Sequence, residues 1–422
     1  MKWRATRLKY LASLPITNGL GEQGRDAGEG SIRYLRTTDI AGPRALDPSK
    51  WASLEPELAR KAPVQRGDLL ICAAGSLGVT YLHDSDEPAC YAGYLARFRP
   101  GPEVDPRFVS FWAQSQSFFD QVATGAVRST IDNFSAGKIR KLEISVPPVD
   151  EQRRIADFLD KETARLDSFT SLRTKEIGLL RTRRRELIRD FVIGANHAER
   201  VTSTLQWVDS LPSHWSVVPL KYAARYGSGH TPSRTHPEYW VDCNIPWISL
   251  FDVGKMRDPR QINMSATEQQ ISRLGVANSS AVVHPAGTVV LSRTASVGFS
   301  TIMDVDMAVS QHFATWTCGT RLRPLYLLHL LRAMAPLFDS LKVGTTNVTV
   351  FMPDLLALRV PLPPLDEQDA IVARIKESTT EIDRFMAATE RQVDLLIERR
   401  QALITAAVVG QIDVTTSRVA HR

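Results

Sequence analysis

The sequence predicts a mixed α/β (α+β) tandem repeat, in which a long antiparallel two-helix coiled coil with pseudo-two-fold symmetry separates two globular domains. Three observations support this fold class. The chain of 422 residues repeats itself, each repeat ends in a long segment with coiled-coil spacing, and the rest mixes strand-like with helical runs. The predicted boundaries are globular domains at 1–150 and 199–365, long helices at 151–198 and 366–410, and a C-terminal tail at 411–422.

The repeat is clearest at two proline-rich junctions. Residues 144–152 read Ile-Ser-Val-Pro-Pro-Val-Asp-Glu-Gln, and residues 360–368 read Val-Pro-Leu-Pro-Pro-Leu-Asp-Glu-Gln, an offset of 216 residues. Matched positions further on include Asp167 with Asp383 and Arg184 with Arg400. Weaker matches at slightly different offsets reach back into the globular domains, which indicates a tandem duplication whose loops have changed length.

Each junction leads into a predicted long helix. The proline pair is excluded from a helix interior, Asp150 and Asp366 stand where an N-cap belongs, and Gly194 and Gly410 supply C-terminal stops. The apolar positions alternate by four and three, which is the spacing of a coiled-coil seam. Because the chain passes through the second globular domain between the two helices, pairing along their length requires an antiparallel arrangement.

The residues expected to pair the helices or to dock a partner are Ile155, Leu159, Leu166, Phe169, Leu180, Ile371, Ile375, Ile382, Phe385 and Leu396. Within this set, Phe169 and Phe385 belong to the outer faces of the helices. Such residues either dock a partner protein or pack against the chain's own globular domains, and the sequence leaves both alternatives open.

The globular domains are predicted to mix strands and helices. Short apolar runs bounded by turn residues indicate strands at 68–73, 91–98, 288–292 and 312–317. Longer periodic runs indicate helices at 108–121 and 324–341. We therefore expect α/β domains whose sheets carry long irregular loops.

Composition narrows the class of protein. The 52 Lys and Arg residues against 46 Asp and Glu give a net charge of +6, which permits a polyanionic partner. The four cysteines are scattered and form no Cys-x-x-Cys pair, so neither a zinc site nor a disulfide framework is expected. Scattered cysteines, the lack of an apolar signal core and the lack of an apolar run of roughly 18 residues favour a cytoplasmic protein outside the membrane.

Catalytic motifs are missing from the sequence. There is no P-loop, no Asn-Pro-Pro-aromatic methyltransferase tetrapeptide, no His-Glu-x-x-His, and no nuclease acid-x-Lys after Pro353-Asp354. The histidines, such as His83 and His284, are isolated along the chain and are expected to be structural rather than metal ligands. This pattern favours a binding protein over an enzyme, although an enzyme with unrecognised catalytic residues is an alternative.

Polar loops offer candidate contacts to nucleic acid. Residues 124–133 and 343–349 precede the strand that leads into each long helix, and both are rich in Gly and in side chains that read base edges and phosphates. The candidate DNA-binding residues are Arg33, Arg36, Ser76, Arg128, Ser129, Asn133, Lys255, Arg257, Arg293, Thr345, Thr346 and Asn347. For each of them the alternative is a solvated loop side chain.

Taken together, the motifs resemble those of the specificity subunit of type I restriction–modification enzymes. The likeness covers essentially the whole chain and rests on Pro-Pro-x-Asp-Glu-Gln before a long helix, which occurs twice at the expected period. It is also carried by 64–71, by Leu-Pro-Ser-His-Trp at 211–215 and by Val-Val-Gly-Gln-Ile-Asp at 408–413.

The resemblance implies that each globular domain is a target-recognition domain that reads one half of a bipartite, asymmetric sequence in double-stranded DNA. It implies no catalysis, cofactor or metal in this chain itself. Partners would be methyltransferase subunits, two of them, which use S-adenosylmethionine, and restriction subunits, which use ATP and Mg²⁺. The alternative is a non-catalytic scaffold with two protein-binding modules on a coiled-coil strut.

Overall fold

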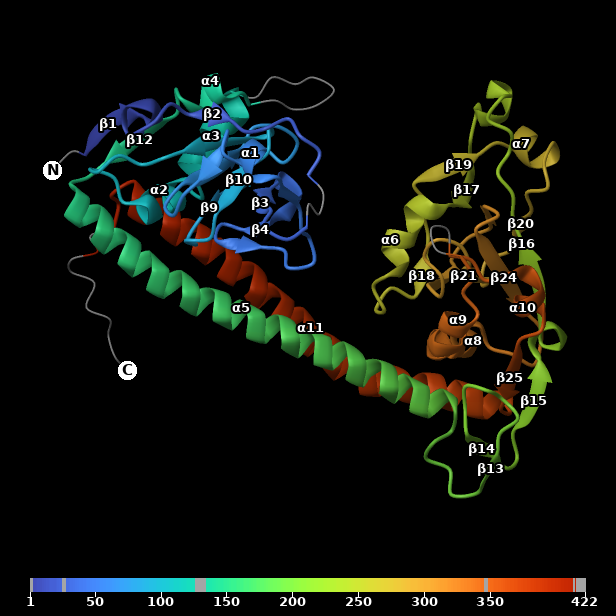
Figure 1. Ribbon diagram of the computed structural model, residues 1–422. Helices are drawn as coiled ribbons and strands as arrows, with labels where there is room; N and C mark the ends of the chain where they lie inside the picture. Colours follow the sequence, from blue (N-terminus) through green and yellow to red (C-terminus); the bar gives the residue numbers. More distant parts are fainter. Residues whose placement is uncertain (1–2, 25–27, 126–133, 345–347, 413, 415–422) are drawn as a thin grey trace. The chain divides into compact units, whose positions relative to one another are not determined.

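The computed structural model describes residues 3–24, 28–125, 134–344, 348–412 and 414. These residues form two compact units: unit 1 comprises residues 1–174 and 390–422, and unit 2 comprises residues 175–389. The two long helices are α5 Val149–Val192 and α11 Leu365–Val408. Each unit therefore contains one globular domain, one half of α5 and the opposite half of α11 (Figure 1). Among the described residues, no helix is long and apolar enough to cross a membrane.

The globular domain of unit 1 is built on two four-stranded sheets, of strand order β6-β3-β10-β7 and β2-β11-β8-β9. The strands are β1 Arg4–Arg7, β2 Thr17–Asn18, β3 Ile32–Leu35, β4 Ile40–Gly42, β5 Ala45–Leu46, β6 Ser53–Leu54, β7 Pro63–Val64, β8 Leu69–Cys72, β9 Thr80–Leu82, β10 Ala89–Tyr91, β11 Leu95–Phe98 and β12 Glu143–Val146. The shorter helices are η1 Leu8–Tyr10, η2 Thr37–Asp39, α1 Pro56–Ala59, α2 Pro106–Trp112, α3 Gln116–Gly125 and α4 Ala136–Ile139.

The second globular domain repeats this plan with a five-stranded sheet, β16-β24-β21-β22-β18, and a four-stranded sheet, β19-β17-β23-β20. Its strands are β13 Arg200–Thr202, β14 Ser210–Pro212, β15 Ser216–Pro219, β16 Ala224–Ser228, β17 Ile245–Ile248, β18 Asn263–Met264, β19 Gln269–Ile271, β20 Val283–His284, β21 Val289–Ser292, β22 Ser300–Met303, β23 Met307–Val309, β24 Phe313–Cys318 and β25 Arg359–Leu362. Its helices are η3 Leu220–Tyr222, η4 Pro237–Trp240, η5 Leu250–Asp252, α6 Val253–Met256, α7 Arg273–Ala277, α8 Pro324–Ala333, α9 Ala335–Ser340 and α10 Met352–Leu356.

The central strand of each domain is buried on both faces. In β8, Leu69 and Ile71 pack toward the core that contains α2 and α3, whereas Leu70 and Cys72 pack into a second core beside β3 and β10. Successive side chains of a strand point to opposite faces, so a continuous apolar run fills both cores. The equivalent strand β21 behaves in the same way, because Val289 and Leu291 lie in one core and Val290 in another.

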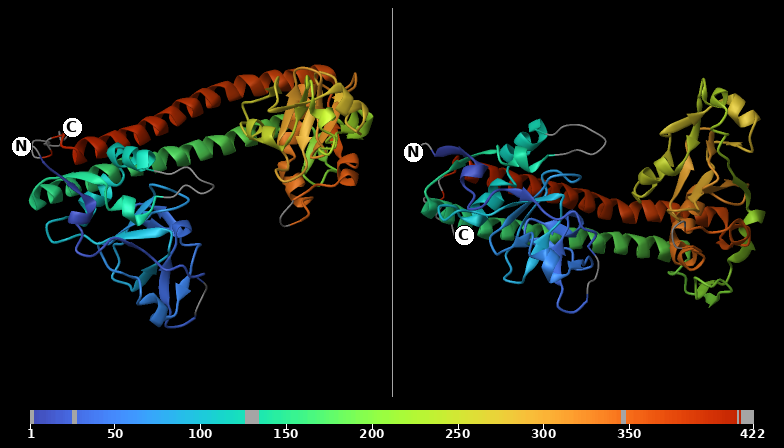
Figure 2. Two further views of the ribbon diagram at one scale, coloured as in Figure 1. Left: turned by 90° about the horizontal axis from the view of Figure 1, so that it is seen from above. Right: turned by 45° about the horizontal axis from the view of Figure 1, so that its top comes forward.

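The long helices pack into these cores in antiparallel fashion within each unit. In unit 1, Ile155 and Leu159 of α5 share a core with Ile404 and Val408 near the end of α11. In unit 2, Val192 near the end of α5 shares a core with residues of the first turns of α11, Ile371 and Ile375. Both views of Figure 2 draw the helix halves of each unit side by side. The predicted two-helix coiled coil is confirmed.

The expected seam residues fall into three groups. Ile155, Leu159, Leu166, Ile371 and Ile375 are buried, and Leu180, Ile382 and Leu396 are half-buried. By contrast, Phe169 and Phe385 are 45% and 50% exposed. They do not lie in the seam or in the cores, so a docking role for them stays a prediction.

Some predicted elements differ in detail. The predicted strand 91–98 contains the last residue of β10 and the whole of β11, separated by residues 92–94, of which 93 and 94 form a turn. The predicted helix 324–341 is divided into α8 and α9 at Met334, because Pro336 lacks the N–H that would continue α8. Asp150 and Asp366 lie inside the first helical turn rather than at the N-cap, since α5 and α11 begin at Val149 and Leu365, one residue before each aspartate.

Candidate nucleic-acid interface

In unit 2 the structure brings three polar segments together, which we term the unit 2 loop cluster: residues 250–257, 293–299, and 343–344 with 348–350. The guanidinium of Arg257 donates to Ser296 Oγ at 3.5 Å, which joins the first segment to the second. The second and third segments are joined by backbone hydrogen bonds from Val350 N to Arg293 O at 2.9 Å and from Ala295 N to Val348 O at 2.8 Å.

The tight turn after β21 positions this cluster. Gly298 has a φ of 95°, and Ala295 has a φ of 62°, a conformation that costs a residue with a Cβ about 1–2 kcal/mol. The hydrogen bond from Ala295 N to Val348 O helps to hold this backbone. In unit 1 the position equivalent to Ala295 is Gly75, which adopts a φ of 78° without that cost.

The basic candidates of unit 2 differ in how far they are engaged inside the protein. Arg293 is half-buried and donates to the carbonyl oxygens of Gln311 at 3.1 Å and Val350 at 3.4 Å. Lys255 Nζ lies 2.7 Å from Glu268 Oε1, and this bond raises the pKa of the lysine. Lys255 and Arg257 are both exposed, but Arg257 contacts the Ser296 hydroxyl and the Phe299 ring instead of a carboxylate, so its charge is the more available of the two.

In unit 1 the two arginine candidates converge on one buried carboxylate. Arg36 donates to Asp39 at 2.7 Å, and this bond raises the pKa of Arg36. Arg33 NH2 lies 3.7 Å from Asp39, and burial lowers the pKa of Arg33. Asp39 is fully buried at the end of η2, so its negative charge offsets much of the positive charge of the two arginines. A DNA contact by either arginine stays a prediction.

The turn after β8 repeats the arrangement of unit 2. Ser76 is exposed on this turn, and Phe134 N donates to Ala73 O at 2.7 Å, which matches the bond from Val350 N to Arg293 O. The segment before α4 therefore meets the turn after β8. The remaining candidates, Arg128, Ser129, Asn133, Thr345, Thr346 and Asn347, lie outside the described residues.

Three aromatic residues at or near the surface were not predicted as contacts, and two of them lie beside arginines. Arg33 stacks 4.2 Å from the ring of Trp51, which is 62% exposed, and Arg234 stacks 3.9 Å from the ring of Trp240. Phe251, in η5, is 70% exposed. Exposed aromatic and arginine planes are surfaces on which unpaired bases stack. The sequence signal that could have indicated an exposed aromatic residue is that Trp51 follows Lys50 in a polar stretch.

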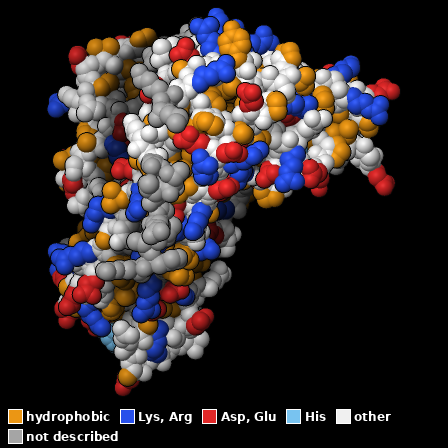
Figure 3. Space-filling model, turned by 90° about the vertical axis from the view of Figure 1, so that its left-hand side faces the viewer, with side chains coloured by type: hydrophobic (Ala, Val, Ile, Leu, Met, Phe, Trp, Pro, Cys, Tyr) orange, Lys and Arg blue, Asp and Glu red, His pale blue; other side chains and the backbone are white. Residues whose placement is uncertain are grey.

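Positive and negative side chains are mixed on one face of the molecule. Figure 3 shows one face of the molecule, on which Lys and Arg side chains are interspersed with Asp and Glu. The ion pairs of Asp39 and Glu268 described above are local examples of the same mixing. Recognition by such a surface depends on particular loop side chains more than on an extended basic patch.

One family model matches most of this chain. The family model for the type I restriction modification DNA specificity domain matches residues 2–177 and 212–393. The chain is 26% identical over 166 residues to the type I restriction enzyme MjaIX specificity subunit of Methanocaldococcus jannaschii, covering 39% of this chain and 38% of that protein. It is 21% identical over 431 residues to the putative MjaX specificity subunit of the same organism, covering 98% and 94%.

A solved structure supports the fold. The matched chain belongs to a structure described as the structural basis underlying complex assembly and conformational transition of the type I R-M system. The likeness has a TM-score of 0.70 with 18% sequence identity and covers 97% of this chain and 98% of that chain. At this identity the likeness establishes the architecture and leaves individual contacts to be argued from the residues themselves.

Proposed function

The chain belongs to the type I restriction–modification DNA specificity family, and we propose that it is the DNA-reading subunit of a type I restriction–modification complex. The observation that carries this proposal is the duplication of a whole unit, each with its own polar loops beside the central strand and its own share of α5 and α11. Two domains with different loop sequences suit a target made of two different half-sites.

Each domain would read one half-site through its loops. Side chains that make good bidentate contacts to bases discriminate by roughly 1–3 kcal/mol each, while contacts to phosphates supply affinity that falls steeply with salt. Joining two readers in one chain makes the second binding event intramolecular, so two modest affinities combine into one specific event. Arg257 and Ser76, both exposed on these loops, are the first residues to test.

The paired helices would set the spacing between the half-sites. Ion pairs hold the helix register: Arg184 Nε lies 2.8 Å from Asp383 in unit 2, and Arg400 Nε lies 2.9 Å from Asp167 in unit 1. A helix of 44 residues is about 66 Å long at ~1.5 Å per residue. A rigid spacer of this kind would make the length of the DNA between the half-sites part of the specificity.

We propose further that this chain is non-catalytic, holds no cofactor for the reaction and recruits the subunits that carry out the chemistry. These would be two methyltransferase subunits, using S-adenosylmethionine, and restriction subunits, using ATP and Mg²⁺, in the cytoplasm. Exposed apolar side chains on the helices support a docking role, since such residues on a polar helix face suit protein contacts. They are Phe169, Leu172, Leu395 and Ile397 in unit 1 and Leu179 and Phe385 in unit 2.

The proposal is tested by expressing the chain with its methyltransferase partners and mapping methylated adenines across a genome. We expect one motif with two specified half-sites separated by an unspecified spacer of fixed length. Complexes that methylate no motif, or a continuous one, would contradict the proposal.

A protein-interaction scaffold is the alternative, because Arg33, Arg36, Lys255 and Arg293 are engaged within the chain. Salt-sensitive binding of duplex DNA by the assembled complex would exclude the scaffold.

A further inference from the structure

Two histidines and one glutamate from separate segments of unit 2 meet where the globular domain joins the helices. His197 follows the end of α5, His214 lies in the turn between β14 and β15, and Glu367 lies in the first turn of α11. Their potential ligand atoms all lie within 4.8 Å of one another. His214 Nε2 is 2.7 Å from Glu367 Oε1, and His197 Nε2 is 3.9 Å from Glu367 Oε2.

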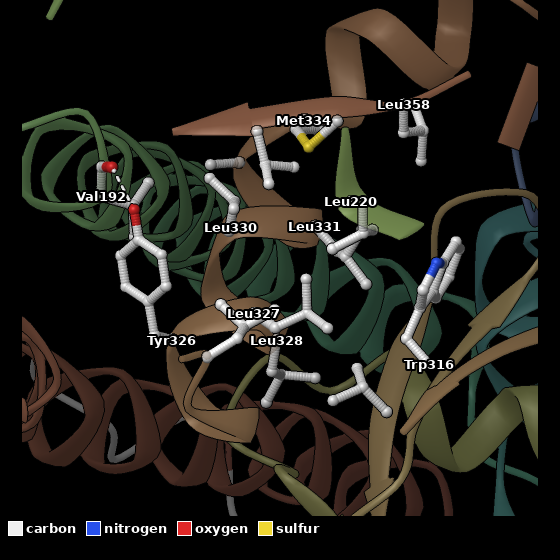
Figure 4. Close-up of a cluster of buried hydrophobic side chains, with 14 of the residues drawn as sticks. Val192, Leu220, Trp316, Tyr326, Leu327, Leu328, Leu330, Leu331, Met334 and Leu358 are labelled. Carbon is white, nitrogen blue, oxygen red and sulfur yellow. Dashed lines mark hydrogen bonds between the residues drawn. The ribbon is translucent and has the colours of Figure 1, made fainter. Parts of the chain in front are cut away.

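The three segments are held in place by contacts that do not involve the histidine side chains. Gly194, with a φ of 61°, ends α5 so close to β14 that a Cβ there would lie 2.5 Å from Pro212 Cγ. The hydroxyl of Tyr326 donates to Val192 O at 3.2 Å and holds the end of α5 in the unit 2 core (Figure 4). Ser213 N donates to Glu199 O at 3.1 Å. The side chains are therefore presented by a preorganised backbone.

The glutamate is oriented by a further contact. The indole of Trp215, which is 7% exposed, donates from Nε1 to Glu367 Oε2 at 2.8 Å. A hydrogen bond that fixes the position of a carboxylate is the usual support of a metal ligand. The histidine rings remain 39% and 46% exposed at His197 and His214, so an ion could reach them from solvent.

The chemistry of this donor set points to a particular class of ion. We propose that His197, His214 and Glu367 form a binding site for Zn²⁺ or a similar late first-row divalent metal ion. Tetrahedral Zn²⁺ with ligands at ~2.0–2.2 Å places the ligand atoms about 3.3–3.6 Å apart. The histidines lie 2.7 Å from Glu367 Oε1 and 3.9 Å from Glu367 Oε2, and the three ligand atoms lie within 4.8 Å of one another, so side-chain rotation would have to bring them to this spacing. A fourth position would be open to water, and Mg²⁺ or Ca²⁺ would bind poorly because they prefer oxygen ligands.

Unit 1 has no histidine at the positions equivalent to His197 and His214. Glu151 and Trp3 stand at the positions equivalent to Glu367 and Trp215, so the glutamate and tryptophan recur in both repeats. The positions equivalent to His197 and His214 are Asp413 and Lys2 in the sequence, and both lie outside the described residues. The glutamate and the tryptophan are therefore common to both repeats in the sequence, whereas the histidine pair belongs to unit 2.

A bound ion would crosslink the end of α5, the β14–β15 turn and the start of α11 within unit 2. Because the ion binds the folded state and not the separated segments, it would raise the melting temperature in proportion to the logarithm of its concentration. This inference does not depend on the proposed DNA recognition, since binding is measured without DNA.

The test uses the untagged full chain, stripped with a chelator and titrated with Zn²⁺ and, as a spectroscopic probe, Co²⁺. We expect one equivalent of either ion to bind, an increase in melting temperature, and no response to Mg²⁺. The variants His197→Gln and His214→Ala should each lower the affinity at least tenfold. The matched control is His236→Ala, because His236 also contacts a glutamate, Glu238, at 2.9 Å, but with no third ligand among the described residues.

His197→Gln keeps the contacts of His214 and Trp215 with Glu367, so this variant is expected to fold even if His214→Ala does not. Circular dichroism checks the fold of both. The proposal is overturned if the wild-type chain binds no equivalent of Zn²⁺ or Co²⁺, or if His197→Gln binds as tightly as the wild type. Thiolate charge-transfer bands with Co²⁺ that disappear in Cys243→Ser would likewise place the ion elsewhere.

Discussion

Gln152 and Gln368 lie 216 residues apart and make the same three hydrogen bonds in the two units. Gln152 accepts from Asp105 N at 2.9 Å and donates to the carbonyl oxygens of Glu103 at 3.0 Å and Pro147 at 2.9 Å. Gln368 accepts from Arg323 N at 2.8 Å and donates to the carbonyl oxygens of Arg321 and Pro363, both at 2.9 Å. Both side chains are fully buried. Each glutamine therefore attaches the start of a long helix to the segment that leads into α2 or α8.

Replacing either glutamine by leucine should destabilise the chain by about 2–4 kcal/mol, because buried backbone groups lose their partners. Gln121→Leu is the matched control, since Gln121 also makes three such bonds, two to Glu143 and one to Ser117, but is half-exposed. We expect it to cost less than about 1 kcal/mol. Urea unfolding measures the differences, and equal losses in all three variants would contradict this account.

The two equivalent ion pairs between the helices should differ in strength. Arg184 is 5% exposed and Asp383 is 24% exposed, whereas Arg400 and Asp167 are 25% and 56% exposed. Asp383→Asn would leave a buried guanidinium without its charge partner and should cost about 2–4 kcal/mol, while Asp167→Asn should cost about 0–1 kcal/mol. Thermal and urea unfolding compare the two variants directly. A larger loss of stability in Asp167→Asn than in Asp383→Asn would contradict this prediction.

His329 should make the protein sensitive to acid. Burial, together with Arg332 and Arg184, lowers the pKa of His329 to about 3. Below pH ~6.5 the unfolded chain binds a proton at this residue and the folded chain does not, so stability falls by up to about 1.4 kcal/mol per pH unit toward the folded pKa.

His329→Phe removes this effect, and Phe111 already occupies the equivalent position of α2. We expect this variant to lose less stability than the wild type between pH 7 and pH 5 by urea unfolding. His236→Ala, which changes an exposed histidine, serves as the control. Parallel losses in the wild type and His329→Phe would show that His329 is not the group responsible.

Two arginines of the unit 2 loop cluster should separate recognition from stability. Arg257 is exposed and its bond to Ser296 is long at 3.5 Å, so Arg257→Ala should change the melting temperature little. The variant should weaken DNA binding by the assembled complex and, if Arg257 contacts a phosphate, lower the slope of log affinity against log salt concentration by about one. Arg293→Ala should instead lower the melting temperature, because Arg293 holds the carbonyl groups of Gln311 and Val350. Filter binding and thermal unfolding distinguish the two effects, and DNA binding unaffected by Arg257→Ala would remove this residue from the interface.

Much of the fold follows from the sequence, because duplication and periodicity are local signals. The repeat of Pro-Pro-x-Asp-Glu-Gln predicted both long helices, and the four-and-three alternation of apolar residues predicted that they pair. Chain order predicted that the pair is antiparallel, because the second globular domain lies between the two helices in the sequence. In the sequence, Arg184 and Arg400 were recognised as matched positions of the repeat. Their role became clear only when the fold placed each beside Asp383 or Asp167 of the other helix.

The site was less predictable, because charge pairing and exposure depend on contacts distant in sequence. Arg33 was expected to face a partner, but folding places it over Trp51 and near Asp39. His197 and His214 are 17 residues apart and looked isolated, and only the start of α11 brings Glu367 between them. A periodic pattern in the sequence does not reveal that residues from three separate segments meet in the fold.

The central claim, that each globular domain reads one half of a bipartite target, is tested most directly by domain exchange followed by methylation mapping. Residues 1–150 would be replaced by the corresponding domain of another member of the family, and the complex with its methyltransferase subunits would be mapped for methylated adenines. We predict that one half-site changes while the other half-site and the spacer length stay the same. A change in both half-sites, or in neither, would contradict the account.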